Sequence, residues 1–222
     1  MSDLRYLTLP NGNQIPSVGL GTYAPRNTDK EISEAIRNAV KVGYRHFDCA
    51  ALYMNEKVIG EALNKAMNDG LVKREELFIT SKLWDTFHRP DLVRTALKTT
   101  LQDLKLEYLD LYLIHWPVSF LEDAGPFPKD DDGVMICSDV DYVDTWKSLE
   151  ECVKEGLVRN IGISNFNSKQ VQRVLDMCSI KPCTNQVEVN VHFANSKLIE
   201  FCHRNGITVT SYCPLGSPDN KQ

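Results

Sequence analysis

The chain alternates between short apolar runs and longer segments in which apolar residues recur every three or four positions. That spacing predicts six helices, each with one buried face, at 29–42, 55–67, 89–106, 142–155, 169–177 and 196–205. The apolar runs predict seven strands, at 17–22, 45–50, 77–84, 109–116, 159–166, 184–190 and 207–213. Regular alternation of strand and helix predicts parallel strands covered by helices.

Local turn and capping signals mark several boundaries of these elements. "YLTL" and "QIPSVGL" flank "PNGN" near the start of the chain, and Asn-Gly favours the tight turn of a β-hairpin. Ser168 is a suitable capping residue for the helix at 169–177. Gly206 predicts the end of the helix at 196–205.

Polar residues stand at the C-terminal ends of otherwise apolar strand runs. In a closed eight-stranded (β/α)8 TIM barrel all such ends meet on one face, which holds the active site. An open doubly wound sheet would gather its ligand residues mainly at one switch point. No Gly-x-Gly-x-x-Gly opens a helix after the first strand, as a Rossmann fold would require. The pattern favours the barrel, with polar strand ends at Asp48, Lys82, His115, Ser164 with Asn165, and Tyr212.

Composition agrees with one α/β domain. The chain has 222 residues, of which 42% are hydrophobic and 25% charged, so it can bury a substantial core. We expect a single partial TIM-barrel domain over residues 1–222. Residues 118–141, rich in Asp, Pro and Gly, are expected to form a long loop over the barrel mouth. A domain boundary there is a weaker alternative, because the strand–helix rhythm resumes afterwards.

Charge and cysteine usage narrow the classes of partner. The net charge is −5 and no basic block occurs, which argues against a nucleic-acid partner. No apolar run approaches the roughly 20 residues of a membrane helix, and the start lacks the order of a secretory signal. Seven scattered cysteines without a C-x-x-C pair indicate reduced thiols in the cytoplasm. No histidine has the spacing of a metal ligand, so no metal site is expected.

Four polar residues on neighbouring strand ends suit general acid catalysis. If Lys82 reaches Tyr53, its charge favours the phenolate and strengthens the phenol as an acid. Asp48 would hold the lysine charged and in place, and His115 would hydrogen-bond a bound oxygen. Together they would protonate an oxygen that gains charge. Taken singly, Tyr53 suits a surface tyrosine, Asp48 and Lys82 a structural ion pair, and His115 a core histidine.

Later strands carry side chains suited to a flat carboxamide-bearing ring. Ser164, Asn165 and Gln186 both donate and accept, and Tyr212 offers a face for stacking. The alternatives are helix capping for Ser164 and Asn165, and backbone hydrogen bonding for Gln186. The aromatic residues that either wall a substrate pocket or belong to the core are Tyr23, Trp84 and Trp116.

The motifs together resemble those of the aldo-keto reductases. The matching stretches are "GLGTY", "GYRHFDCAALYMNEKVIGEAL", "ITSKLW", "DLYLIHWP", "VRNIGISNF", "NQVEVN" and "SYCPLGSPD", from Gly19 to Asp219 in family order. The resemblance implies a TIM barrel that binds NADPH without a Rossmann domain. It implies hydride transfer to a small-molecule aldehyde or ketone.

The resemblance also assigns roles to individual residues. Tyr53 becomes the proton donor of a tetrad completed by Asp48, Lys82 and His115. The substrate pocket would be formed by Tyr23, Trp84, His115 and Trp116. The cofactor site would comprise Gly21, Thr22, Tyr23, Asp48, Ser164, Asn165, Gln186, Tyr212 and, in the loop expected over the pyrophosphate, Leu215, Ser217 and Asp219.

One departure from the family concerns the end of the sequence. The chain stops at Gln222, after the seventh strand, whereas the family continues through another helix, an eighth strand, its helix and a C-terminal loop. Those parts carry the residues that hold the 2′-phosphate, so NADPH over NADH is implied by resemblance alone. If the enzyme is complete we expect a monomer; if the chain is truncated, its open barrel edges allow self-association. The alternative function is a weakly active or non-catalytic binding or scaffold protein.

Overall fold

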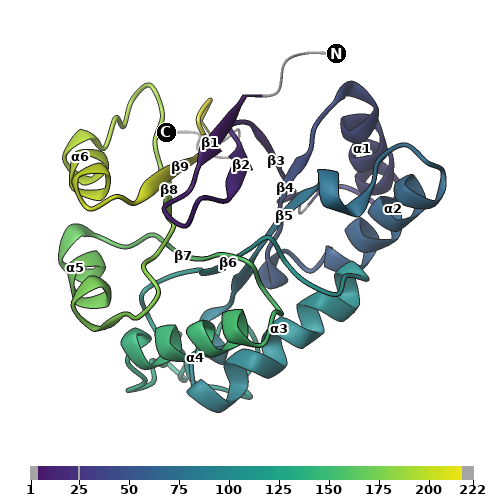
Figure 1. Ribbon diagram of the computed structural model, residues 1–222. Helices are drawn as coiled ribbons and strands as arrows, with labels where there is room; N and C mark the ends of the chain where they lie inside the picture. The colour runs from purple at the N-terminus through teal and green to yellow at the C-terminus, as the bar shows by residue number, and fades with distance from the viewer. Residues whose placement is uncertain (1–4, 25, 217–222) are drawn as a thin grey trace.

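A computed structural model describes residues 5–24 and 26–216 of the chain. Seven strands form one parallel sheet in which each strand pairs with the next in sequence. They are β3 (Gly19–Gly21), β4 (His46–Asp48), β5 (Phe78–Leu83), β6 (Leu111–Ile114), β7 (Ile161–Ser164), β8 (Thr184–Glu188) and β9 (Thr208–Tyr212). Figure 1 shows the helices around the outside of these strands. The sequential parallel order confirms the predicted barrel over the doubly wound sheet.

The helices lie where the apolar spacing predicts them, within two residues at each end. They are α1 (Asp29–Val42), α2 (Glu56–Asn68), α3 (Pro90–Leu104), α4 (Tyr142–Lys154), α5 (Ser168–Met177) and α6 (Ser196–Arg204). Short 3₁₀ turns lie after β4 and on both sides of β5: η1 (Ala51–Tyr53) follows β4, η2 (Arg74–Glu76) precedes β5 and η3 (Asp85–Phe87) follows it. No helix in the described ranges is long and apolar enough to cross a bilayer.

The N-terminal hairpin closes one end of the barrel interior. Strands β1 (Tyr6–Thr8) and β2 (Gln14–Pro16) pair antiparallel, and Gly12 takes the positive φ of 87° that the turn needs. Leu9 and Ile15 are buried in one cluster with side chains of β5, of β6 and of the residue before β8, namely Phe78, Leu111, Leu113 and Cys183. The hairpin therefore fills the end of the barrel opposite the polar strand ends (Figure 1).

The main core lies between the strands and the helices. It joins outward-facing strand residues to the apolar faces of the helices, among them Phe47, Ile79, Ile114, Ile163, Ile36, Leu63, Leu97 and Trp146. Each fully buried side chain of this kind stabilises the fold by about 1.5–3 kcal/mol relative to exposure. At Gly60 a Cβ atom would lie 2.4 Å from the Asp103 carbonyl oxygen, so a glycine is needed for α2 and α3 to pack this closely.

One capping prediction is wrong by a single position. Asn167, not Ser168, is the N-cap of α5, and its side chain accepts hydrogen bonds from the backbone N–H groups of Lys169 and Gln170. Ser168 is instead the first residue of the helix. Gly206, by contrast, follows the end of α6 with a φ of 69°, as predicted.

The segment at 118–141 has no helix in the structure. It folds back on itself through isolated antiparallel bridges that join Phe120 to Cys137 and Lys129 to Met135. It reaches the barrel at Trp84, whose indole Nε1–H donates to the carbonyl oxygen of Pro126 at 2.7 Å. The expectation of a single domain, with this loop over the mouth, stays a prediction.

Candidate active site

Lys82 is the centre of the polar cluster at the strand ends. Neighbouring residues of β5 point to opposite faces, so Ser81 faces the helices while Lys82 points into the barrel. The Lys82 side chain is only 1% exposed. Its ammonium group donates to a carboxylate oxygen of Asp48, to the Cys49 carbonyl oxygen at 2.8 Å and to the Tyr53 hydroxyl at 3.4 Å. All three ammonium hydrogens therefore have acceptors.

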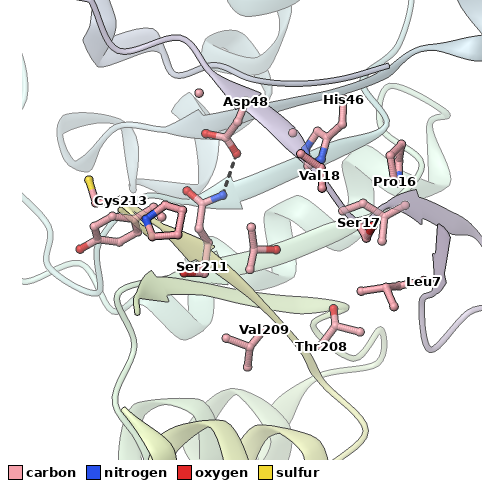
Figure 2. A pocket seen from close by; sticks show the side chains of 17 residues that line it. Leu7, Pro16, Ser17, Val18, His46, Asp48, Thr208, Val209, Ser211 and Cys213 are labelled. Carbon is pink, nitrogen blue, oxygen red and sulfur yellow. Dashed lines mark hydrogen bonds between the residues drawn. The ribbon is translucent and has the colours of Figure 1, made fainter. Parts of the chain in front are cut away.

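Asp48 joins three strands through its carboxylate. One oxygen accepts from Lys82 on β5, and the other accepts from Gln186 Nε2 on β8 at 2.7 Å. The dashed line at Asp48 in Figure 2 is this second bond. The alternative that the buried Gln186 amide satisfies backbone groups does not describe this contact, which is with a side chain. The carboxylate is thus oriented by a cation and an amide from opposite sides.

The electrostatics of the pair favour its charged form. Burial alone would lower the pKa of Lys82, but Asp48 and Tyr53 outweigh it and raise the pKa above the ordinary lysine value. Lys82 therefore stays an ammonium ion at neutral pH. The part of the hypothesis in which Asp48 keeps the lysine charged and in place agrees with this geometry.

The acidity of Tyr53 differs from the sequence hypothesis. Burial raises the pKa of the phenol, and this effect exceeds the opposing effect of Lys82, so the net pKa lies above its ordinary value. Lysine does favour the phenolate, as expected, but the prediction of a net stronger acid is wrong. Among the described residues, the Tyr53 hydroxyl accepts from Lys82 and donates to none. Its proton is free for a bound oxygen.

His115 lies directly after β6 and faces the same cluster. Its ring centroid is 6.0 Å from that of Tyr53 and 5.2 Å from that of Trp84. Burial, assisted by the charge of Lys82, lowers the pKa of His115 to about 3. The imidazole is therefore neutral at physiological pH, with one N–H donor and one acceptor nitrogen.

The polar residues of β7, β8 and β9 form one hydrogen-bonded series. Ser164 Oγ donates to the Gln186 carbonyl oxygen at 2.8 Å. Asn165 Nδ2 donates to the His115 carbonyl oxygen at 3.0 Å, and Asn165 Oδ1 accepts from the Tyr212 hydroxyl at 3.0 Å. Helix capping, the simpler alternative for Ser164 and Asn165, does not occur here, since Asn167 caps α5.

The last residue of β3 and the residues after it support the cluster from the other side. Gly21 pairs in register with Asp48, and Thr22 Oγ1 donates to the Asp48 carbonyl oxygen at 2.9 Å. Asn55, a buried residue that the sequence reasoning missed, donates to the Thr22 carbonyl oxygen at 2.8 Å. Tyr23 is 65% exposed, with its ring centroid 5.2 Å from that of Tyr53.

An aromatic wall adjoins the cluster, and part of it was not predicted. Trp84 is buried, while Trp116 is 42% exposed. The ring centroids of Phe120 and Phe127, both in the 118–141 loop, lie 6.1 and 5.4 Å from that of Trp84. The sequence signal for Phe127 was the stretch "GPFP" within a loop otherwise rich in Asp and Gly. We use "aromatic wall" below for Trp84, Phe120 and Phe127.

A cavity of about 480 Å³ opens between the edge strands β3 and β9. It extends from the hairpin to Asp48, Gln186 and Tyr212, and Figure 2 shows Asp48 and Cys213 near one end and Leu7 near the other. Leu215 is 97% exposed and is not packed against the cluster. Ser217 and Asp219 lie outside the described residues. No three His, Cys, Asp or Glu side chains gather as metal ligands within the described ranges.

Comparison with known proteins agrees with this arrangement. Residues 17–219 match the model of the aldo/keto reductase family. The chain is 48% identical over 215 residues to aldo-keto reductase family 1 member A1 of Gallus gallus, covering 96% of this chain and 65% of the relative. The Sus scrofa protein of the same name is 50% identical over 212 residues, with 95% and 65% covered.

A solved structure supports the fold in the same way. The structure described as the aldose reductase from Schistosoma japonicum matches with a TM-score of 0.93 at 48% identity, covering 96% of this chain and 70% of that one. The chain thus spans about 65% of the length of the curated relatives given above. From its motifs, its barrel and these matches, the chain belongs to the aldo/keto reductase family.

Proposed function

We propose that this protein is an NADPH-dependent oxidoreductase that reduces aldehydes or ketones to alcohols, with Tyr53 as the general acid. The observation that carries the proposal is the placement of the Tyr53 hydroxyl 3.4 Å from the buried Lys82 ammonium group. A phenol proton without an acceptor among the described residues, beside a fixed cation, suits protonation of an oxygen that gains charge. Membership of the family supports the same reaction class.

Each member of the tetrad has a distinct role in this proposal. Tyr53 transfers its proton to the carbonyl oxygen as the carbonyl carbon gains a hydride, which yields the alcohol and a phenolate. Lys82 stabilises that phenolate, because the two groups already lie in contact. Asp48 holds Lys82 in its charged form. Neutral His115 orients the carbonyl through a hydrogen bond from its ring.

The side chains around Tyr212 fit a nicotinamide by the chemistry of their donors and acceptors. Asn165 and Gln186 each carry an amide, Ser164 carries a hydroxyl, and the Tyr212 ring is flat and part-buried, which suits a carboxamide-bearing ring. When bound, NADPH supplies the hydride. We propose NADPH over NADH from family membership. Further proposed contacts are Gly21, Thr22, Tyr23, Leu215, Ser217 and Asp219.

The proposed substrate is a small carbonyl compound with an apolar or mixed body. Tyr23, Trp84 and Trp116 supply aromatic surface beside the proposed acid, and His115 supplies the polar group. We infer that the 118–141 loop covers this pocket, since it contacts Trp84 through Pro126 and Phe127. Seven free cysteines support a reducing, cytoplasmic location.

The replacement Tyr53→Phe tests the proposal with little change in packing. The rate of NADPH oxidation with an aldehyde should fall by about 10²–10⁴-fold, the usual contribution of a general acid. Cofactor binding, followed by nicotinamide fluorescence, should be retained because the ring stays in place. Tyr108→Phe, remote from the cluster and beside Arg74 and Arg159, is the control and should keep its rate. An unchanged rate for Tyr53→Phe would refute the proposed acid.

The open edges of the sheet favour a second proposal, about assembly and binding. Among the described residues, β3 and β9 each pair with one neighbour, and the 480 Å³ cavity lies between them. Unpaired strand edges recruit other strands. We propose that copies of this chain self-associate there, in which case a scaffold or weakly active role becomes the alternative to catalysis by a monomer. A molar mass equal to that of one chain at every protein concentration, together with tight NADPH binding, would exclude this alternative.

A further inference from the structure

A buried Asp–His–Ser series lies behind the aromatic wall. Asp85 and His88, both 1% exposed, belong to the turn between β5 and α3, and Ser119 stands at the start of the 118–141 loop. His88 Nδ1 is 2.9 Å from Ser119 Oγ, which donates to the Val140 carbonyl oxygen at 2.7 Å. The two ends of the loop are therefore joined to each other and, through His88, to the barrel.

The direction of each hydrogen bond follows from the carbonyl group at the end of the series. The Val140 oxygen only accepts, so the single hydroxyl hydrogen of Ser119 is used there. Ser119 Oγ must then accept from His88, which places a hydrogen on His88 Nδ1. In a neutral imidazole the other nitrogen, Nε2, carries none and is itself an acceptor.

The bare nitrogen faces a second acceptor. His88 Nε2 lies 3.7 Å from Asp85 Oδ1, and within the described part of the chain neither atom has a hydrogen-bond partner. Two buried acceptors that face each other are costly, because both have lost water and neither has a donor. At 3.7 Å the two atoms are too far apart for a hydrogen bond as they stand. A proton on the Asp85 carboxyl removes the repulsion between them and lets Asp85 donate to Nε2 once the two groups approach.

The surroundings favour a neutral pair with that one proton. Burial raises the pKa of Asp85 to about 8, although a hydrogen bond from the Trp116 backbone N–H acts to lower it. Burial lowers the pKa of His88 to about 3. Charged groups on the adjoining elements are largely paired elsewhere. Arg89 pairs with Asp91 and Glu122, Asp141 pairs with Arg173, Asp144 pairs with Lys147, and His115 is kept neutral by burial.

We propose that Asp85 and His88 are positioning residues for the reaction proposed above, and that the proton they share fixes the base of the 118–141 loop and with it the aromatic wall. The loop carries Pro126 and Phe127, whose contacts with Trp84 complete the wall. Without the proton, a buried carboxylate faces an imidazole lone pair, which destabilises this support of the loop base, while the His88–Ser119 bond and the hydrogen bond from the Phe120 N–H to the Asp85 carbonyl oxygen remain.

The sign of the pH dependence follows from Asp85. Its pKa is raised in the folded protein, so the proton is bound below about pH 8 and lost above it. The wall is therefore fixed at neutral pH and released at alkaline pH. Above the transition the protonated fraction falls about tenfold per pH unit, which limits the rise in KM to about tenfold per unit.

The replacement Asp85→Asn removes the titration and keeps the geometry. An asparagine amide N–H can donate to His88 Nε2 at every pH. We would follow tryptophan fluorescence, to which Trp84 contributes, and the KM and kcat of a bulky aldehyde across about two pH units on each side of the transition. Asp91→Asn, at an exposed carboxylate in the first turn of α3, is the matched control.

The expected result is a fluorescence transition near the Asp85 pKa in the wild type and in Asp91→Asn, absent in Asp85→Asn. The alkaline rise in KM should disappear in Asp85→Asn as well, with kcat unchanged. A transition that persists in Asp85→Asn overturns the proposal. The inference rests on the proposed function only for its effect on KM. If the protein oxidises no NADPH, the proposed function is refuted, and the fluorescence transition alone then decides whether Asp85 and His88 fix the loop.

Discussion

The ion pair between Asp48 and Lys82 is unequally buried, and this inequality predicts unequal effects of removing either partner. The Lys82 side chain is 1% exposed and that of Asp48 is 16% exposed. In Asp48→Asn the ammonium ion keeps the Cys49 carbonyl and the Tyr53 hydroxyl as neutral acceptors but loses its carboxylate. The new amide also meets two donors, Lys82 and Gln186, with only one acceptor oxygen.

The magnitude follows from what each variant leaves behind. Asp48→Asn leaves a buried cation without a charged partner, which costs about 3–5 kcal/mol of unfolding free energy. Lys82→Met keeps the apolar stem and leaves a carboxylate that retains the hydrogen bond from Gln186 and has access to water. The loss should then be about 1–2 kcal/mol, close to that of a hydrogen bond to a charged group.

Urea unfolding at neutral pH measures both losses, with the slope m checked for constancy. The double variant Asp48→Asn/Lys82→Met should be more stable than Asp48→Asn alone, because no buried charge is left. The pKa of Lys82 is raised, so the stabilisation is complete below the ordinary lysine pKa of 10.5 and is lost only as the pH rises beyond it. A loss in Lys82→Met equal to or greater than that in Asp48→Asn would refute this reasoning.

Two further predictions concern the packing beneath the site. Glu56 is buried and accepts from Ser81 Oγ at 2.5 Å, and burial raises the pKa of Glu56 to about 7. The folded state therefore binds the Glu56 proton more tightly than the unfolded state does. The free energy of unfolding should fall by up to about 3 kcal/mol as the pH rises from the ordinary glutamate pKa through the folded-state pKa. Thermal unfolding of Glu56→Gln should lack this component, and an identical pH profile for both proteins would contradict it. At Gly162 a Cβ atom would lie 2.8 Å from the Thr184 carbonyl oxygen, whereas at Gly21 it would meet nothing within 4 Å. Gly162→Ala should therefore lose about 1–3 kcal/mol in urea unfolding, and Gly21→Ala, its control, much less; equal losses would show that steric overlap is not the cause.

Much of the fold was predictable because its pattern is local. Helical spacing and apolar runs are properties of neighbouring residues, and parallel alternation of strand and helix leaves few arrangements. The polar strand ends were predictable for a related reason. Once the strands run parallel, the C-terminal residues Asp48, Lys82 and Tyr212 must lie at the same end of the barrel.

The rest depends on burial and on loop conformation, which a sequence pattern does not report. The net pKa of Tyr53 is decided by desolvation, and Phe127 reaches Trp84 through a loop without periodicity. Asn167 and Ser168 are both good capping residues, and only the position at which the backbone turns into α5 decides between them. No sequence motif marks the Asp85–His88 pair, because the acid–base properties of the two side chains come from their burial away from water.

The hydrogen bond from Gln186 to Asp48 has a consequence for the order in which the polar cluster forms during folding. These residues are 138 positions apart, and the contact closes a loop that contains β5, β6 and β7. Such a long closure is entropically expensive and slow relative to local helix formation. Asp48 and Lys82 are both synthesised before β8, so the Asp48 carboxylate can bond to Lys82 before its second donor, Gln186, exists. Recovery of the proposed carbonyl reduction after dilution from denaturant would therefore lag behind recovery of helix content, by the time that β8 takes to join the sheet.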